Sequence, residues 1–399
     1  MNILKKAFCR VVQFAFKLAI PFLPYTTPKI LEDCIDIISI LQEKNINCIL
    51  LVVSNSARKY GLTNSLEENL KLNNIEFIVY DKVKQNPTIS LIEEGVKLYN
   101  SNNCLALVAF GGGSQIDCAK AIGARIAYPN KTIPMLKGTL KVLKKLPTLI
   151  AIPTTAGSGS ETTVAAVVTD DKTSHKYTLN NFTMIPKYAV LDPKLTYTLP
   201  KHLTATTGLD ALTHAVEAFI GRSRTISSKR DALEAVKLIF DNILIAYNEP
   251  NNYNARKNML RASYLAGCAF TKSYVGYIHA IAHTLGGQYD TPHGLANSVI
   301  MPVVLKEYGS SVTKKLAKLA LKVGLADISD TYDDASNKFI AGIIRLNEQM
   351  NIPKTFDFIK EEDIKMMVNF ADKEANPLYP VPKLFGKNEL EKIYYQIKS

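Results

Sequence analysis

Between residues 30 and 200 the chain repeatedly joins a short, unbroken apolar run to a segment with helical periodicity, and this alternation limits the fold more than any other feature. The clearest runs are NCILLVVS (47–54), CLALVAF (104–110) and TLIAIPTT (148–155), with IEFIVYD (75–81) and YAVLDP (188–193) beside them. Strands covered on both faces by helices have this continuous apolar character. The alternation predicts an α/β domain with a parallel sheet.

The pattern of apolar residues changes near residue 203, where long helical stretches such as DALTHAVEAFIG and SKRDALEAVKLIFDNILIAY replace the strand-like runs. We therefore predict an N-terminal parallel-sheet domain over 1–202, with 1–25 as an amphipathic extension, followed by an all-helical domain over 203–399.

Composition narrows the class of protein. Hydrophobic residues make up 47% and charged residues 21% of the 399 residues, as in ordinary globular enzymes. The net charge of +12 comes from lysines spread in short pairs, so we expect no nucleic-acid partner. The six cysteines form no CxxC pair and lie mostly in apolar runs, which predicts buried free thiols and a cytoplasmic protein.

The first 25 residues, MNILKKAFCRVVQFAFKLAIPFLPY, begin with two lysines and then become apolar, as a signal peptide does. Arg10, Gln13 and Lys17 interrupt the apolar run at helical spacing, which indicates an amphipathic helix instead. We expect this helix to pack on its own domain or on a partner subunit in preference to a membrane surface, and we expect no stable membrane insertion.

Two loops rich in glycine and hydroxyl groups follow strand-like runs. In LALVAFGGGSQIDCAKAIG (105–123), three glycines precede a helix whose N-terminus can bind phosphate. A plain turn, with Ser114 as the cap and Asp117 completing a capping box, is the alternative. IPTTAGSGSETT (152–163) offers hydroxyl donors to a phosphate, a ribose or an amide, and is otherwise an ordinary turn-rich loop.

Metal-ligating residue types occur in two helical segments. Asp210 and His214 are four residues apart in GLDALTHAVEAF, so they share a helix face and can chelate a cation or simply hydrogen-bond each other. Glu217 follows as a solvated or structural carboxylate. His279 and His283 have the same spacing, and His293 follows Thr-Pro at a predicted turn. One carboxylate with imidazoles suits Fe²⁺ or Zn²⁺ better than Mg²⁺ or Ca²⁺.

These motifs together, in this order, resemble the iron-containing (group III) alcohol dehydrogenase family over roughly residues 30–399. The match includes FGGGSQIDCAKAIG, IPTTAGSGSETT, TGLDALTHAVEAF, YLAGCAF, HAIAHTLGGQYDTPHG and the late Asn376-Pro377. The resemblance implies a dehydroquinate-synthase-like fold, in which a dinucleotide-binding α/β domain precedes a helical metal-binding domain. It implies Fe²⁺, with Zn²⁺ as the alternative, held by Asp210, His214, His279 and His293.

The resemblance also assigns the remaining polar residues. His283 is off the metal and is a candidate proton-relay residue, whereas His175 and His202 match no ligand position and are structural or surface residues. The predicted cofactor-binding residues are Ser54, Gly111, Gly112, Gly113, Ser114, Asp117, Thr154, Thr155, Ser158 and Lys176.

One position departs from the pattern of the NAD-using members. Ser54 stands where many of them carry an acid that pairs with the adenosine ribose, and Arg58 and Lys59 are close in sequence. We therefore hypothesise that NADP(H) is accepted, with NAD(H) as the alternative. The implied reaction moves a hydride between NAD(P)(H) and a small primary alcohol or aldehyde in a homodimer or larger homo-oligomer. The alternatives are a glycerol-dehydrogenase-like polyol dehydrogenase and a dehydroquinate-synthase-like lyase.

Overall fold

The computed structural model describes residues 1–173 and 175–399, and their contacts divide the chain into two compact units. One unit is Pro24–Leu199, and the other joins Met1–Leu23 to Pro200–Ser399. The N-terminal segment is thus grouped with the helices, not with the α/β part to which the sequence analysis assigned it. None of the helices in the described residues is long and apolar enough to span a bilayer.

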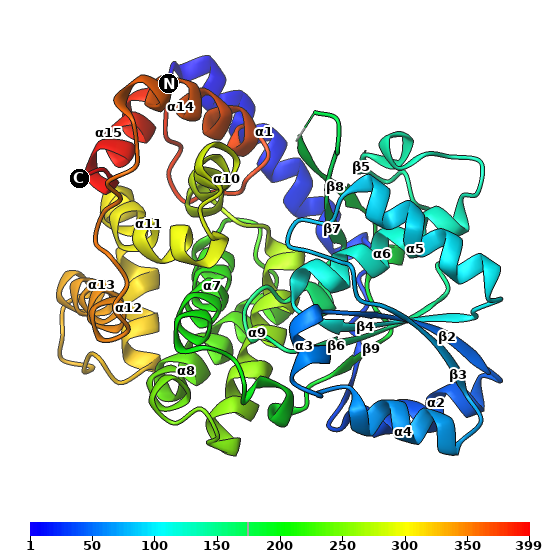
Figure 1. Ribbon diagram of the computed structural model, residues 1–399. Coiled ribbons are helices and arrows are strands. Elements are labelled where there is room, and N and C mark those ends of the chain that lie inside the picture. The colour runs from blue at the N-terminus through cyan, green and yellow to red at the C-terminus, as the bar shows by residue number, and fades with distance from the viewer. Residues whose placement is uncertain (174) are drawn as a thin grey trace. The chain divides into compact units, whose positions relative to one another are not determined.

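The α/β unit is built on a six-stranded, wholly parallel sheet with the order β1-β9-β6-β4-β2-β3 (Figure 1). The strands are β1 (Lys29–Leu31), β2 (Cys48–Val53), β3 (Glu76–Tyr80), β4 (Ala106–Gly111), β6 (Thr148–Pro153) and β9 (Tyr188–Val190). The predicted parallel sheet is confirmed. A small second sheet, of β5 (Gly138–Thr139), β8 (Lys176–Asn180) and β7 (Ala165–Thr169), was not predicted.

Alternate residues of the central strands enter two separate cores. Leu50 and Leu107 belong to one core, whereas Leu51 and Val108 belong to the other. The first core includes residues of α5 (Ile89–Ser101) and α6 (Gly113–Ala127), and the second includes residues of α2 (Ile37–Glu43), α3 (Asn55–Lys59) and α4 (Asn64–Leu72). Burial on both faces explains why these strands read as unbroken apolar runs.

The other unit is helical, as predicted. It comprises α1 (Ile3–Ala19), α7 (Lys201–Ile220), α8 (Ile226–Asn248), α9 (Tyr253–Ser273), α10 (Tyr277–Tyr289), α11 (His293–Tyr308), α12 (Thr313–Lys322), α13 (Tyr332–Gln349), α14 (Glu361–Ala375) and α15 (Lys387–Ile397). Every residue of α7 from Gly208 to Ile220 is buried. A helix buried all round places its polar side chains against neighbouring helices, where each of them needs a partner.

Candidate metal centre

Asp210 and His214 occupy successive turns of α7, and both are buried. The His214 ring stacks on Phe270 of α9 with the ring centres 4.2 Å apart. The ring of His279 is also close, with the ring centres 4.5 Å apart, so Phe270 and His279 hold the imidazole next to the carboxylate one turn earlier.

Two further histidines meet this pair from α10 and α11. The ligand atoms of Asp210, His214, His279 and His293 all lie within 4.8 Å of one another. His293 is the first residue of α11, after Pro292, so it begins a helix and is not in a turn as predicted. The structure thus brings together the four residues that the sequence singled out as ligands.

Acceptor atoms of Asp210, His279 and His293 point toward one common position. The amide nitrogen of Asn297 lies 2.7 Å from Asp210 Oδ1, 3.1 Å from His293 Nε2 and 3.3 Å from His279 Nε2. Three acceptors therefore face one point, although an amide has only two N–H donors. Imidazole nitrogens and a carboxylate oxygen that converge in this way fit Fe²⁺ or Zn²⁺.

Glu217, one turn after His214, holds His279 from the opposite side of the ring. Its carboxylate lies 2.6 Å from His279 Nδ1 and accepts the N–H groups of Gly276 and Ile278 at 2.8 and 2.9 Å. Proton donation from Nδ1 leaves the Nε2 lone pair for a cation. Glu217 is fully buried and not solvated, and burial raises its pKa to about 7. The sequence did not reveal this pairing.

Burial also favours the neutral imidazoles. The pKa of His279 lies well below its usual value because of burial and the neighbouring histidines. Burial lowers the pKa of His293 to about 4, although Asp210 opposes the shift. Both side chains thus keep lone pairs at neutral pH, which is the form that binds metals.

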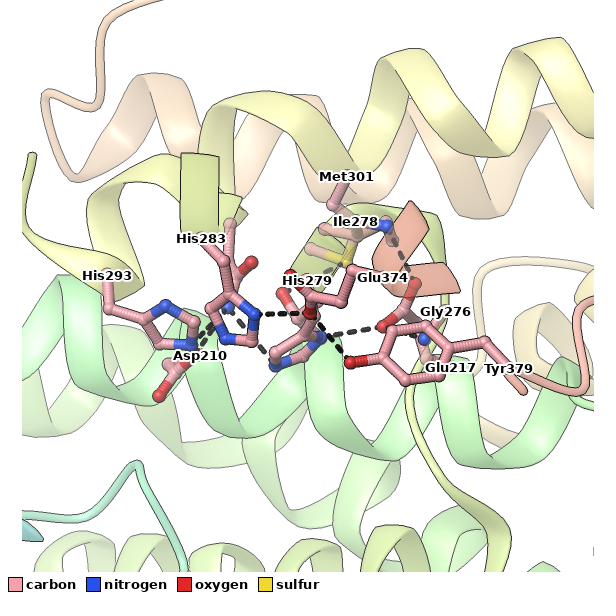
Figure 2. Close-up of polar contacts among 12 residues, drawn as sticks. Asp210, Glu217, Gly276, Ile278, His279, His283, His293, Met301, Glu374 and Tyr379 are labelled. Atoms are coloured by element: carbon pink, nitrogen blue, oxygen red, sulfur yellow. Dashed lines mark hydrogen bonds and ion pairs between the residues drawn. The ribbon is translucent and has the colours of Figure 1, made fainter. Parts of the chain in front are cut away.

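His283 lies one turn beyond His279 but belongs to a different network. Its Nδ1 is 2.7 Å from Glu374 Oε1, which also accepts the Tyr379 hydroxyl at 2.7 Å (Figure 2). Burial lowers the pKa of His283, but the charge and hydrogen bond of Glu374 outweigh this and raise it. The His283 side chain is 46% exposed, against 3% for His279. Neither Glu374 nor Tyr379 was predicted from the sequence. His175 and His202 are both exposed.

The predicted cofactor loops lie together in the α/β unit. Gly111 and Pro153, which end β4 and β6, are paired in register, and Thr154 N–H donates to Gly111 C=O at 3.0 Å. A side chain on Gly113 would meet the Ser158 hydroxyl. The structure therefore brings Gly111–Ser114 next to Thr154, Thr155 and Ser158, at the strand edge where parallel sheets bind ligands.

The helix after these glycines begins differently from the predicted capping box. Gly112 is the N-cap of α6, its N–H donates to Gln115 Oε1 at 3.1 Å, and Ser114 lies inside the helix. Asp117 accepts the Val167 N–H of β7 at 3.1 Å, and burial raises its pKa to about 6. Asp117 thus joins α6 to β7 in place of capping the helix.

Two predicted cofactor residues lie on other strands of this unit. Ser54 follows β2, its N–H donates to Phe110 C=O, and its hydroxyl caps α3 by accepting the Ala57 N–H. Arg58 forms an ion pair with Glu67. Lys176 begins β8, opposite Thr169 of β7.

The comparisons with known proteins agree with this geometry. Residues 31–193 match the family described as iron-containing alcohol dehydrogenase, and residues 204–397 match the C-terminal part of that family. The 1,3-propanediol dehydrogenase of Citrobacter freundii is 35% identical over 351 residues, which are 87% of this chain and 90% of that protein. The NADPH-dependent butanol dehydrogenase of Clostridium saccharobutylicum is 32% identical, over 89% and 93% of the two chains.

A solved structure extends the similarity to the fold. The alcohol dehydrogenase from Oenococcus oeni superposes with a TM-score of 0.90 at 30% identity, over 94% of this chain and all of that one. The resemblance inferred from the sequence, the fold class and the NAD(P)-dependent dehydrogenase class are thereby confirmed. The chain belongs to the iron-containing alcohol dehydrogenase family.

Proposed function

We propose that the protein interconverts a small primary alcohol and its aldehyde, with Fe²⁺ held by Asp210, His214, His279 and His293. The observation that carries this proposal is the convergence of four ligand atoms within 4.8 Å of one another. The names of the similar propanediol and butanol dehydrogenases support a short, unbranched substrate.

The bound cation would supply Lewis acidity at the substrate oxygen, and the nicotinamide would supply the hydride chemistry. The protein residues orient the ligands and partly neutralise the charge of the cation. Glu217 holds the proton on His279 Nδ1, and Asp210 contributes the one negative charge of the ligand set. Phe270 and the surrounding helices exclude water from His214.

His283 is the proposed proton-relay residue. Glu374 fixes its Nδ1, so Nε2 is the atom that can take up or release a proton, and the side chain is 46% exposed. Tyr379 donates to the same carboxylate and keeps Glu374 in place. This assigns His283 to proton movement, and His214, His279 and His293 to the metal.

Anaerobic purification with metal analysis, followed by an absorbance assay of nicotinamide turnover on short aldehydes and diols, tests the proposal. Turnover should disappear with a chelator and return with Fe²⁺. His279→Ala should lose the metal, whereas His283→Ala should keep it and lose most turnover. Equal loss of metal in both variants would contradict the ligand assignment, and bound metal without turnover would favour the lyase alternative.

We further propose that the protein accepts NADP(H). Ser54 places no carboxylate at the end of β2 to repel a 2′-phosphate, and Lys59 is exposed nearby, although Glu67 neutralises Arg58. Ser54→Asp should lower kcat/KM for NADPH relative to NADH by about tenfold, since one charge repulsion is worth roughly 1 kcal/mol or more. Ser56→Asp, two residues away, is the control. An NADH preference in the unmodified protein would contradict the hypothesis.

We also propose a cytoplasmic location and a homo-oligomeric state for the protein. All six cysteines are buried and none forms a disulfide, which supports a cytoplasmic enzyme. A homodimer or larger homo-oligomer remains our expectation, and light scattering of the purified protein measures it.

A further inference from the structure

Helix α1 docks on its unit through its polar side. Lys5 forms an ion pair with Asp372 of α14 at 2.8 Å. Arg10 donates to the carbonyls of Val381 and Pro382 at 2.8 and 3.0 Å. Gln13 is buried and donates to Tyr379 C=O at 2.7 Å. These bonds, together with the buried Cys9 and Ile20, hold the helix by a mixed polar and apolar side and leave its other large apolar side chains outside.

The opposite side of this helix is a row of large apolar side chains. They recur every three or four residues, continue into the turn after the helix, and are each 57–88% exposed. We call this set the apolar stripe: Ile3, Leu4, Phe8, Val11, Phe14, Leu18 and Phe22. Contiguous exposed apolar surface of this kind marks an interaction site.

The charges that α1 itself carries all have one sign, although Asp372 neutralises Lys5 and Glu389 lies near Lys6. The chain has no Asp or Glu before Glu32, but it carries Lys5, Lys6, Arg10 and Lys17 within the helix. At about 100° per residue, Lys6, Arg10 and Lys17 fall along one edge of the stripe. A partner for this surface must therefore combine apolar and anionic groups.

A cationic pocket adjoins the same edge. Lys17 lines a pocket of about 370 Å³ with Arg222, Arg224 and Lys315, and none of these four forms an ion pair within the described parts of the chain. Burial, together with the nearby arginines and Lys17, lowers the pKa of Lys315 to about 8. An anion in this pocket would relieve the repulsion among these cations.

A second copy of the chain is the less suitable partner. Two such stripes packed together would bring both sets of cations close to one another, and neither N-terminal segment holds a carboxylate to compensate. An anionic bilayer supplies acyl chains for the stripe and phosphates for the cations. We propose that α1 lies on the surface of an anionic phospholipid bilayer and that the pocket beside Lys17 receives a lipid phosphate.

Co-sedimentation of the full-length protein with vesicles tests this. The protein should sediment with phosphatidylcholine vesicles that contain phosphatidylglycerol, less with phosphatidylcholine alone, and less at high salt. The double variant Phe14→Ser/Leu18→Ser should bind at least about tenfold more weakly, because it removes apolar area that the two side chains would bury among the acyl chains. Leu72→Ser, at an exposed leucine on α4, is the control.

The pocket has its own variants. Lys17→Gln/Arg222→Gln should remove most of the preference for phosphatidylglycerol, whereas Lys229→Gln on α8 should not. Thermal unfolding and alcohol turnover in solution should stay unchanged in all of these variants, because none of the residues belongs to the proposed active site.

Three results would overturn the proposal. The unmodified protein could stay in the supernatant with the anionic vesicles. The stripe variant could separate a dimer in light scattering without affecting vesicle binding, which would identify a second copy as the partner. Finally, the Lys17→Gln/Arg222→Gln variant could bind inorganic phosphate more weakly, while Phe14→Ser/Leu18→Ser sediments with vesicles as the unmodified protein does. That combination would identify free phosphate as the ligand of the pocket.

Discussion

Residues that do not face the proposed metal position define the site as much as the ligands do. Glu217 accepts three N–H groups around the start of α10, and Glu374 accepts from both His283 and Tyr379. Two histidines one turn apart on α10 are thus held by different carboxylates. These two partners separate a metal ligand from a proton-relay residue.

Glu217→Gln tests this at the scale of one residue. Glutamine has the same shape but places an NH₂ group toward at least one N–H donor, so His279 should lose its fixed tautomer. Metal affinity should fall about 10–100-fold, the usual effect of removing a partner behind a metal ligand. Competition with a chromogenic chelator measures it, with Glu234→Gln, at a half-exposed glutamate of α8, as control. Unchanged affinity would show that Glu217 only supports folding.

Lys120 is a second residue whose burial predicts a large effect. It is fully buried and donates to Thr163 C=O, Thr163 Oγ1 and Ala165 C=O at 2.7–2.9 Å. Lys120→Met should lower the free energy of unfolding by about 3–5 kcal/mol, because it removes the positive charge near Asp117 and Glu161 and leaves the buried acceptors of Thr163 without their donor. Urea unfolding measures this, and Lys97→Met on the exposed side of α5 should have little effect.

At the scale of elements, the site depends on the close approach of α7 and α11. Gly294, the second residue of α11, lies against the backbone of α7, where a side chain would come 2.8 Å from the Thr206 carbonyl carbon and closer to its oxygen. The same two helices carry Asp210 and His293. The distance between the helices therefore sets the distance between these two ligands.

Gly294→Ala should separate the two helices. Unfolding free energy should fall by about 1–3 kcal/mol, the usual cost of overpacking, and metal affinity should fall with it because His293 moves away from Asp210. Gly287→Ala on α10 is the matched control, since a side chain there meets nothing within 4 Å. Calorimetry measures the stability of both variants, and metal titration measures their affinity. Equal stability and equal metal affinity in the two variants would contradict this argument.

At the scale of the whole molecule, the two proposed binding functions lie in different units. The metal residues all belong to the unit of Met1–Leu23 and Pro200–Ser399, and the cofactor residues all belong to Pro24–Leu199. Ligand binding should thus stabilise each unit through its own contacts.

Hydrogen exchange measures this separation. Metal should slow exchange in α7, α10 and α11, and NADPH should slow it in the turns after β2, β4 and β6. At a concentration one hundred times Kd, either ligand should add about 2.7 kcal/mol of stability to the state that binds it. Protection of the glycine turn by metal alone, with none in α7, would contradict the assignment.

The sequence by itself determined the features that depend on a few neighbouring residues. Unbroken apolar runs predicted the strands of the parallel sheet, and Gly111–Gly113 predicted a turn that leads into a helix. The spacing of Asp210 and His214 placed them on one helix face. Helical and strand periodicities are local, so a short window of sequence is enough to read them.

Only the tertiary structure decided how distant elements meet. His279 and His283 share a spacing, and their different roles follow from Glu217, 62 residues before His279, and Glu374, 91 residues after His283. The amphipathic pattern of residues 1–25 predicted a helix packed on its own domain or on a partner subunit, but only the hydrogen bonds to the segment 377–382 show which side of α1 faces inward. Such partners are set by the packing of whole helices, which no local pattern records.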